Sequence, residues 1–161
     1  MNYLKQIETT WEQLRQQTAE QKLASPARLT AKTESGTLLA EMADVECLAC
    51  SVWSISFRPA APRNTTDAAQ QLAADVRYLT EPLQMLEFDK TADMAQVRSA
   101  PPAQDAQTRR YFELVVRPDE ISMRRYEKTP GQPRRTIPAT LTRDVFQRLA
   151  NDFAGAAVGR R

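Results

Sequence analysis

The sequence predicts an α+β domain in which helices pack on a mainly antiparallel sheet. Three segments have the 3-4 apolar spacing of amphipathic helices, and the runs between them are rich in β-branched and aromatic residues, which are typical of strands. Short turns join most of these runs, so strands that are neighbours in sequence should pair antiparallel. The expected order is α-β-β-β-α-β-β-β-β-β-α, with residues 1–154 forming a single domain and residues 155–161 a disordered tail.

The first segment, residues 3–23, is expected to be a helix whose apolar side chains form a narrow seam. Ser25-Pro26 should end it, because the residue before a proline avoids helical geometry. Such a seam packs on the chain's own sheet, which is the commoner arrangement, or against a partner. The residues of this candidate partner contact are Leu4, Ile7, Trp11 and Leu14.

Residues 27–58 are expected to form three strands. The first two flank the turn Glu34-Ser35-Gly36, where glycine suits a hairpin, and the third lies in the apolar run 45–57. A second helix is expected over residues 66–79, with Asn64 among its candidate N-caps.

The second half of the chain is expected to hold two hairpins, a short strand and a final helix. The first hairpin comprises strands 83–89 and 94–98, and the stretch 99–107 has the composition of a mobile loop. The short strand is expected at 134–137. The helix should begin at Thr142, a good N-cap, and end at Gly155.

The hairpin of residues 109–127 is the best-specified element, because its residue pairs agree on one register when Pro118-Asp119 forms the turn. The predicted apolar and aromatic pairs are Val116–Ile121, Leu114–Met123 and Tyr111–Tyr126. The predicted charge pairs are Glu113–Arg124, Arg110–Glu127 and Arg117–Glu120.

The composition excludes several classes of function. The chain has no histidine, so a mechanism that needs an imidazole base or ligand is not open to it. Its four glycines are scattered and do not form a phosphate-binding loop. The net charge of +2 is too small to imply a polyanion partner. However, 17 of the 22 basic residues are arginine, which favours bidentate pairing with carboxylate or phosphate.

Cys47 and Cys50 form a C-x-x-C motif, which is found in redox and zinc sites. They lie in a strand-like run, where residues three apart point to opposite faces, whereas a redox pair needs its first cysteine at a helix N-terminus. A structural zinc needs four Cys or His ligands, and this chain has two Cys and no His. We therefore expect buried, unreactive cysteines, with an intermolecular disulfide or metal site as the alternative.

Cations and tyrosines share one face of the C-terminal strands, an arrangement typical of proteins that bind single-stranded nucleic acid. The cations on this face are Arg109, Arg117, Arg124, Lys128 and Arg134. The residues of this candidate anion or nucleic-acid face are Arg109, Tyr111, Arg124, Tyr126 and Arg134. The acidic partners predicted across the hairpin instead favour a solvated face that neutralises itself.

Acidic residues are the third candidate group. Glu87 and Asp89 alternate on one strand, and Glu113 lies elsewhere in the sheet. Paired acids can perform hydrolytic acid–base chemistry, but alternate acids on a strand usually mark its solvated side. The sequon that begins at Asn64 is more simply a helix cap.

Two resemblances bear on function. Segments 78–83 (Tyr-Leu-Thr-Glu-Pro-Leu), 97–102 (Val-Arg-Ser-Ala-Pro-Pro) and 121–126 (Ile-Ser-Met-Arg-Arg-Tyr) resemble small bacterial proteins of unknown function. That resemblance covers most of the chain and implies no activity. The element order α-β-β-β-α-β-β is similar to that of type III secretion chaperones, which are small cytoplasmic homodimers that bind polypeptides. This chain departs from them in its additional strands and in not being acidic.

These observations predict a non-catalytic protein that binds another polypeptide or associates with itself, with no cofactor, no metal and no catalytic residue. Its support is the seam of the first helix and the need to cover sheet edges. The alternatives are a nucleic-acid-binding module that uses the basic face of strands 109–135 and a carboxylate-dependent enzyme. The expected partner is a polypeptide or a second copy rather than nucleic acid or a membrane, and the expected compartment is the cytoplasm.

Overall fold

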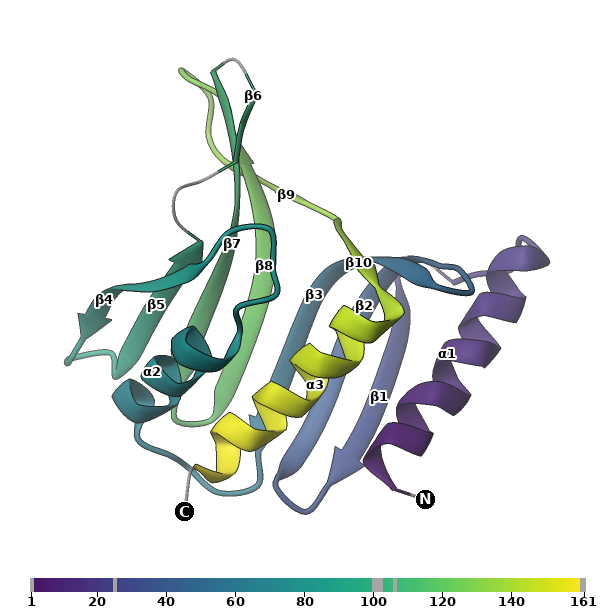
Figure 1. Cartoon of the computed structure of the whole chain (residues 1–161), viewed down its shortest axis with the longest axis horizontal. Helices are drawn as coiled ribbons and strands as arrows, with labels where there is room; N and C mark the ends of the chain where they lie inside the picture. Colours follow the sequence, from purple (N-terminus) through teal and green to yellow (C-terminus); the bar gives the residue numbers. More distant parts are fainter. Residues whose placement is uncertain (1, 25, 100–102, 106, 160–161) are drawn as a thin grey trace.

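A computed structural model of the chain describes residues 2–24, 26–99, 103–105 and 107–159. Figure 1 shows two layers, an open sheet and a layer of three helices that cover one of its faces. The α+β class predicted from the sequence, with a mainly antiparallel sheet and helices packed on it, is confirmed.

The helices are α1 (Tyr3–Ala19), α2 (Thr65–Asp75) and α3 (Arg143–Val158). The strands are β1 (Ala27–Thr33), β2 (Gly36–Val45), β3 (Ala49–Pro59), β4 (Leu83–Asp89), β5 (Met94–Ser99), β6 (Ala103–Asp105), β7 (Thr108–Arg117), β8 (Glu120–Lys128), β9 (Arg135–Ile137) and β10 (Ala139–Thr142). The N-caps predicted for α2 and α3 are both formed: Asn64 accepts a hydrogen bond from the Asp67 N–H, and Thr142 accepts one from the Val145 N–H.

The strand order is β1-β2-β3-β8-β7-β5-β4, and these neighbours pair antiparallel. Strands β3 and β8 pair only at one end, from Ile55–Met123 to Phe57–Ile121, and then separate. Strand β9 pairs with β8 and β10 pairs with β3, so the consecutive strands β9 and β10 occupy the fork between them (Figure 1).

Alternate side chains of each strand are buried beneath the helices, as period-2 patterning requires. One such row crosses the sheet through Leu29, Ala40, Ile55, Met123, Leu114 and Val97. Helix α1 packs on β1 and β2, α3 crosses β2 and β3, and α2 packs on β4, β5 and β7. The described helices leave the other side uncovered, and we call it the open face.

The seam of α1 packs within the chain. Ile7 and Trp11 are fully buried and Leu14 nearly so, and the rings of Trp11 and Phe146 meet edge-on at 5.5 Å between centroids. These three side chains are therefore part of the chain's own core and not on its surface, whereas Leu4 is 42% exposed.

Helix α1 also protects the outer edge of the sheet at β1. The Gln6 side chain donates to the Lys32 carbonyl oxygen at 2.9 Å and accepts from the Lys32 N–H at 2.8 Å. The amide thus binds the N–H and carbonyl groups of Lys32, which are backbone groups that an edge strand would otherwise offer to another chain.

Two predicted helix ends were wrong. Helix α1 ends at Ala19 instead of residue 23, because no apolar side chain extends the seam, and Gln21 adopts a positive φ of 57°. Helix α2 ends at Asp75 instead of residue 79. Val76 turns out of the helix with ψ of 86° and is itself fully buried.

The predicted end of the last helix was also wrong. Gly155 lies inside α3, and the following Ala156 is fully buried, so the apolar face continues past the glycine. The helix ends at Gly159, whose φ of 92° suits a residue without Cβ. Residues 155–158 are thus helical and not a disordered tail, and residues 160–161 lie outside the described residues.

Two short strands were not predicted. Strand β10 directly precedes the cap of α3 and is formed by its pairing with the distant β3. Strand β6 lies in the stretch 99–107, predicted to be a mobile loop, and pairs with β7. Residues 100–102 and 106 of that stretch lie outside the described residues.

Candidate functional site: a basic pocket on the open face

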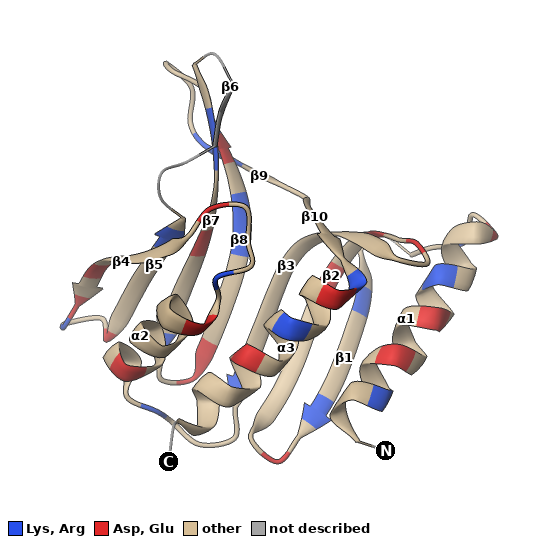
Figure 2. Cartoon of the chain, in the orientation of Figure 1, with Lys and Arg blue, Asp and Glu red and all other residues tan. Residues whose placement is uncertain are grey.

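A pocket of about 410 Å³ lies on the open face, where β5, β7 and β8 meet the segment that precedes β9. The side chains that line it are Gln96, Arg98, Arg109, Tyr111, Lys128 and Arg134. Four of these six are cations, and Figure 2 shows that basic and acidic residues both occur along β7 and β8. The described lining of the pocket itself contains basic residues and no acidic residue.

A single buried carboxylate lies beneath these cations. Glu113 is 3% exposed, and its Oε2 accepts hydrogen bonds from Arg98 Nη2 at 2.9 Å and from Arg134 Nη1 at 2.8 Å. Burial alone would raise the pKa of Glu113, but hydrogen bonds from Arg134, Arg98 and Gln96 outweigh it, so the pKa lies below its ordinary value. Glu113 is therefore ionised at neutral pH and holds the two guanidinium groups in place.

Tyr111 lines the pocket, and Tyr126 packs against it. The rings of Tyr111 and Tyr126 lie 5.8 Å apart between centroids, tilted by 30°. Arg98 lies over the Tyr111 ring at 4.7 Å, and Arg134 lies over the Tyr126 ring at 3.9 Å. Because guanidinium groups already stack on these rings, the rings position arginines and are not free platforms for another flat group.

Arg109 and Lys128 lie directly opposite each other in the register of β7 and β8. Like charges in this position destabilise a pair of strands. Arg109 is exposed, and Lys128 Nζ donates to the carbonyl oxygens of Thr129 and Gln132. Among the side chains that the structure describes, which do not include those of residues 103–105, neither cation forms a salt bridge with a carboxylate, so an anion between them would relieve their repulsion.

The structure brings most of the predicted anion face together. Arg109, Tyr111 and Arg134 line the pocket, and Tyr126 supports it through Tyr111 and Arg134. Arg124 does not line it but is exposed nearby on the open face of β8.

The predicted register of residues 109–127 is confirmed pair for pair, but of its three opposed charge pairs only one forms an ion pair among the described residues. Arg110 and Glu127 do form an ion pair at 2.8 Å. Glu113 instead binds Arg98 and Arg134, and Glu120 binds Arg58 at 3.4 Å. Because β7 has β8 on one side and β5 on the other, Arg124 of β8 competes with Arg98 of β5 for the carboxylate of Glu113.

Two pocket residues, Gln96 and Arg98, were not expected at this site from the sequence. Lys128 was expected on the same face as Arg109 and Arg134, because it alternates with Tyr126 and Arg124, and it lines the pocket. Gln96 and Arg98 reach the pocket because β5 pairs with β7, and a single hairpin carries no signal for that non-local pairing.

The acidic candidates are not brought together. Glu87 and Asp89 lie on the edge strand β4, two strands away from Glu113, and Asp89 accepts hydrogen bonds from the Thr91 and Ala92 N–H groups. Within the part of the chain that the structure describes, no group of three His, Cys, Asp or Glu residues could hold a metal ion.

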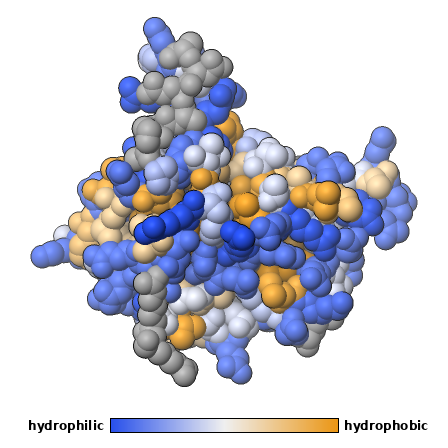
Figure 3. All heavy atoms as spheres, viewed as in Figure 1, coloured by the Kyte–Doolittle hydropathy of each residue, from blue (hydrophilic) through white to orange (hydrophobic). Residues whose placement is uncertain are grey.

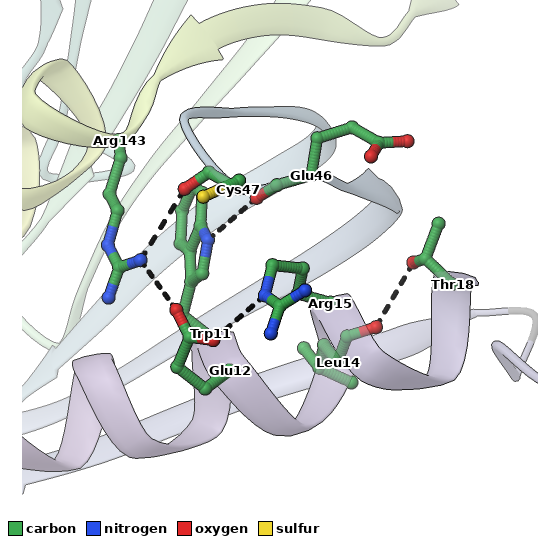
Figure 4. A network of polar contacts seen from close by, with 8 residues as sticks. All are labelled: Trp11, Glu12, Leu14, Arg15, Thr18, Glu46, Cys47 and Arg143. Carbon is green, nitrogen blue, oxygen red and sulfur yellow. Dashed lines mark hydrogen bonds and ion pairs between the residues drawn. The ribbon is translucent and has the colours of Figure 1, made fainter. Parts of the chain in front are cut away.

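The two cysteines lie in different environments, so the prediction that both are buried was wrong for Cys47. Cys47 is exposed in the turn between β2 and β3, whereas Cys50 is buried in β3, which raises its pKa to about 12. Figure 4 shows how that turn is held: Trp11 donates to the Glu46 carbonyl oxygen, and Arg143 bridges the Cys47 carbonyl oxygen and the Glu12 carboxylate.

None of the described helices is long and apolar enough to cross a membrane. Figure 3 shows a helix-covered side that is mostly hydrophilic with scattered hydrophobic areas. Comparisons with protein-family models, curated proteins and solved structures found no match to this chain.

Proposed function

We propose that this chain is a non-catalytic binding module whose basic pocket takes an anionic group. The observation that carries the proposal is the charge of the pocket: four lining cations surround one buried carboxylate. Glu113 neutralises part of the charge of Arg98 and Arg134, and Arg109 and Lys128 remain without a carboxylate partner among the described residues.

The chemistry of the lining selects phosphate or carboxylate oxygens. Guanidinium groups offer planar pairs of donors that match such oxygens, and a lysine adds a point charge. Arg98 and Arg134 are held by Glu113 and by the tyrosine rings, so little side-chain conformational entropy has to be lost when an anion binds.

The test is calorimetric titration with inorganic pyrophosphate at about 50 mM salt, where phosphate contacts are strong. Saturable binding is expected, with at least a tenfold loss in the double variant Arg109→Ala/Lys128→Ala. The matched control is Lys22→Ala/Arg148→Ala, which removes the same charge from exposed positions away from the pocket. Absence of binding, or equal loss in both variants, would overturn the proposal.

A second candidate function is self-association through the free edge of the sheet. The β1 edge is occupied by Gln6, whereas the edge strand β4 carries Leu86 at 52% and Phe88 at 36% exposure. We propose a second copy as its occupant, because two identical edges can pair antiparallel about a two-fold axis. Light scattering over a concentration series should show a dimer that Leu86→Lys abolishes. A monomer at every concentration would refute this candidate.

A further inference from the structure

We propose that the ligand of the basic pocket is single-stranded nucleic acid, whose strand continues from the pocket across the open face to Trp53. This inference rests on the proposed function and adds the class of ligand to it. Three features carry it: an exposed indole on the open face, an unpaired arginine between that indole and the pocket, and the phosphate-binding chemistry of the pocket itself.

Trp53 follows the buried Val52 in β3, so the alternation of faces places it on the open face. In the pairing of β2 with β3, Met42 is opposite Val52 and Glu41 is opposite Ser54, so Trp53 is the extra residue of a β-bulge. Because of this bulge Ser54 follows on the same face, and the alternation resumes at the buried Ile55. Val52 is buried beneath the helices, while the Trp53 indole is 38% exposed.

Arg124 lies between Trp53 and the pocket. Met123 and Ile55 are the last paired residues of β8 and β3, and Arg124 and Ser54 follow them on the open face. Arg124 is exposed and has no ion-pair partner among the described residues. Arg124 could therefore bind a phosphate without first breaking an ion pair with a carboxylate.

The distance suits a short strand of nucleotides. Four residues along β8 separate Lys128 from Arg124, which is about 13 Å at about 3.3 Å per residue. The step from β8 to β3 adds more than the roughly 4.8 Å between paired strands, because the two strands separate after Ile55–Met123, so the path is longer than roughly 18 Å. Single-strand binding sites begin at about four nucleotides, so the open face offers a site near the lower limit of that range.

The aromatic groups separate nucleic acid from other polyanions. Arg98 and Arg134 cover the rings of Tyr111 and Tyr126, which leaves Trp53 as the platform on which a base can stack. An acidic peptide satisfies the cations but gains nothing from an exposed indole. Duplex bases are paired and stacked on each other, so a duplex cannot use Trp53 in this way either.

The experiment measures fluorescence anisotropy of labelled oligothymidylates of two, four and eight nucleotides at about 50 mM and about 200 mM salt, with pyrophosphate titrated in parallel. Affinity should rise steeply from two to four nucleotides, then level off, and fall at the higher salt. Trp53 fluorescence should be quenched on binding, and Trp11, which is fully buried, supplies an unaffected signal.

Trp53→Leu should weaken the four-nucleotide strand about five- to 150-fold, since stacking of one base contributes about 1–3 kcal/mol and about 1.4 kcal/mol is a factor of ten. Arg124→Ala should weaken it and lower the salt dependence by about one phosphate contact. Neither change should alter pyrophosphate binding. Leu48→Ala is the matched control, because Leu48 is 74% exposed in the turn between β2 and β3 and lies off the proposed path.

The outcomes separate the two proposals. If pyrophosphate binds but oligonucleotide affinity depends neither on length nor on Trp53, the pocket binds anions and the nucleic-acid inference fails. If polyglutamate or vesicles of anionic lipid bind as tightly as the four-nucleotide strand, the inference also fails, in favour of an acidic polypeptide or a membrane surface. If neither pyrophosphate nor any oligonucleotide binds, the proposed function itself fails.

Discussion

The indole N–H of Trp11 donates a hydrogen bond of 2.9 Å to the main-chain carbonyl oxygen of Glu46. This bond joins the middle of α1 to the turn between β2 and β3, and the fully buried indole also meets Phe146 of α3. One side chain thus connects the first helix to a sheet turn, as Figure 4 shows, and also contacts the last helix. The seam of α1 is a structural joint between distant parts of the chain.

Replacing Trp11 should therefore destabilise the whole domain. Trp11→Ala should lower the free energy of unfolding by about 3–5 kcal/mol, because it removes a large buried ring. Trp11→Phe should lower it by about 1–3 kcal/mol, since most of the ring volume stays and the Glu46 carbonyl loses its donor. Urea unfolding followed by circular dichroism measures both changes. An unchanged midpoint for Trp11→Ala would contradict the role of Trp11 in linking α1 to the turn and to α3.

Gln6→Ala should open the β1 edge. The Lys32 N–H and carbonyl would lose the side-chain amide that now binds both groups. We expect a loss of about 1 kcal/mol and at least fivefold faster hydrogen exchange at the Lys32 amide, with little change for the amides of β3. Gln6→Glu is a useful second variant, because it keeps an acceptor for the Lys32 N–H but cannot donate to the carbonyl. Unaltered exchange at Lys32 in both variants would argue against edge protection.

Glu113→Gln should have opposite effects on stability and on binding. Arg98 and Arg134 would lose their common carboxylate. We expect the free energy of unfolding to fall by about 1–2 kcal/mol, which is less than for a fully buried ion pair because solvent screens the two partly exposed guanidinium groups. The pocket would meanwhile gain one unit of positive charge, so affinity for pyrophosphate should rise severalfold. A fall in both quantities would show that Glu113 mainly shapes the pocket and does not limit its charge.

Stability should fall in acid. The pKa of Glu113 is lowered from 4.5 in the folded chain, and so are the pKa values of Glu127, which is hydrogen-bonded by Arg135 and Arg110, and Glu12, which is hydrogen-bonded by Arg143 and Arg15. A lowered folded pKa means that the unfolded chain takes up protons first, so this stability is present above pH 4.5 and is lost below it. Urea midpoints measured between pH 7 and pH 3 test this. In Glu113→Gln the midpoint should fall less steeply as the pH decreases.

The two thiols should differ sharply in reactivity. Cys47 is exposed and should react with a thiol reagent in the folded protein at pH 8, whereas Cys50 is buried with a pKa of about 12 and should react only after unfolding. Cys47→Ser should abolish the reaction of the native protein, and Cys50→Ser should leave it intact. Two rapidly reacting thiols in native protein would place Cys50 at the surface.

Local pairing was the part of the fold that the sequence could predict. The hairpin of β7 and β8 has its register determined by residues close in sequence, and the caps at Asn64 and Thr142 depend on the three residues that follow them. Non-local pairing was not predictable in this way. Strand β10 exists because β3 is available to it, and Glu113 binds Arg98 because β5 lies on its other side.

The residues of the candidate site show the same difference between local patterns and non-local pairing. Arg109, Tyr111 and Arg134 could be identified because alternation places them on one face of neighbouring segments. Gln96 and Arg98 join them only through the strand order. The exposure of Cys47 had a different cause: the apolar run 45–57 is interrupted by a turn whose carbonyl groups are held by Trp11 and Arg143.

The fork between β3 and β8 has a consequence for how the chain folds. Strands β9 and β10 are consecutive, yet one pairs with the hairpin of β7 and β8 and the other with a strand from the first third of the chain. They can dock only when both of those parts are already formed, so this closure should come late and slowly, as contacts distant in sequence do. Once docked, residues 135–142 tie the two parts together, and neither should unfold without the other.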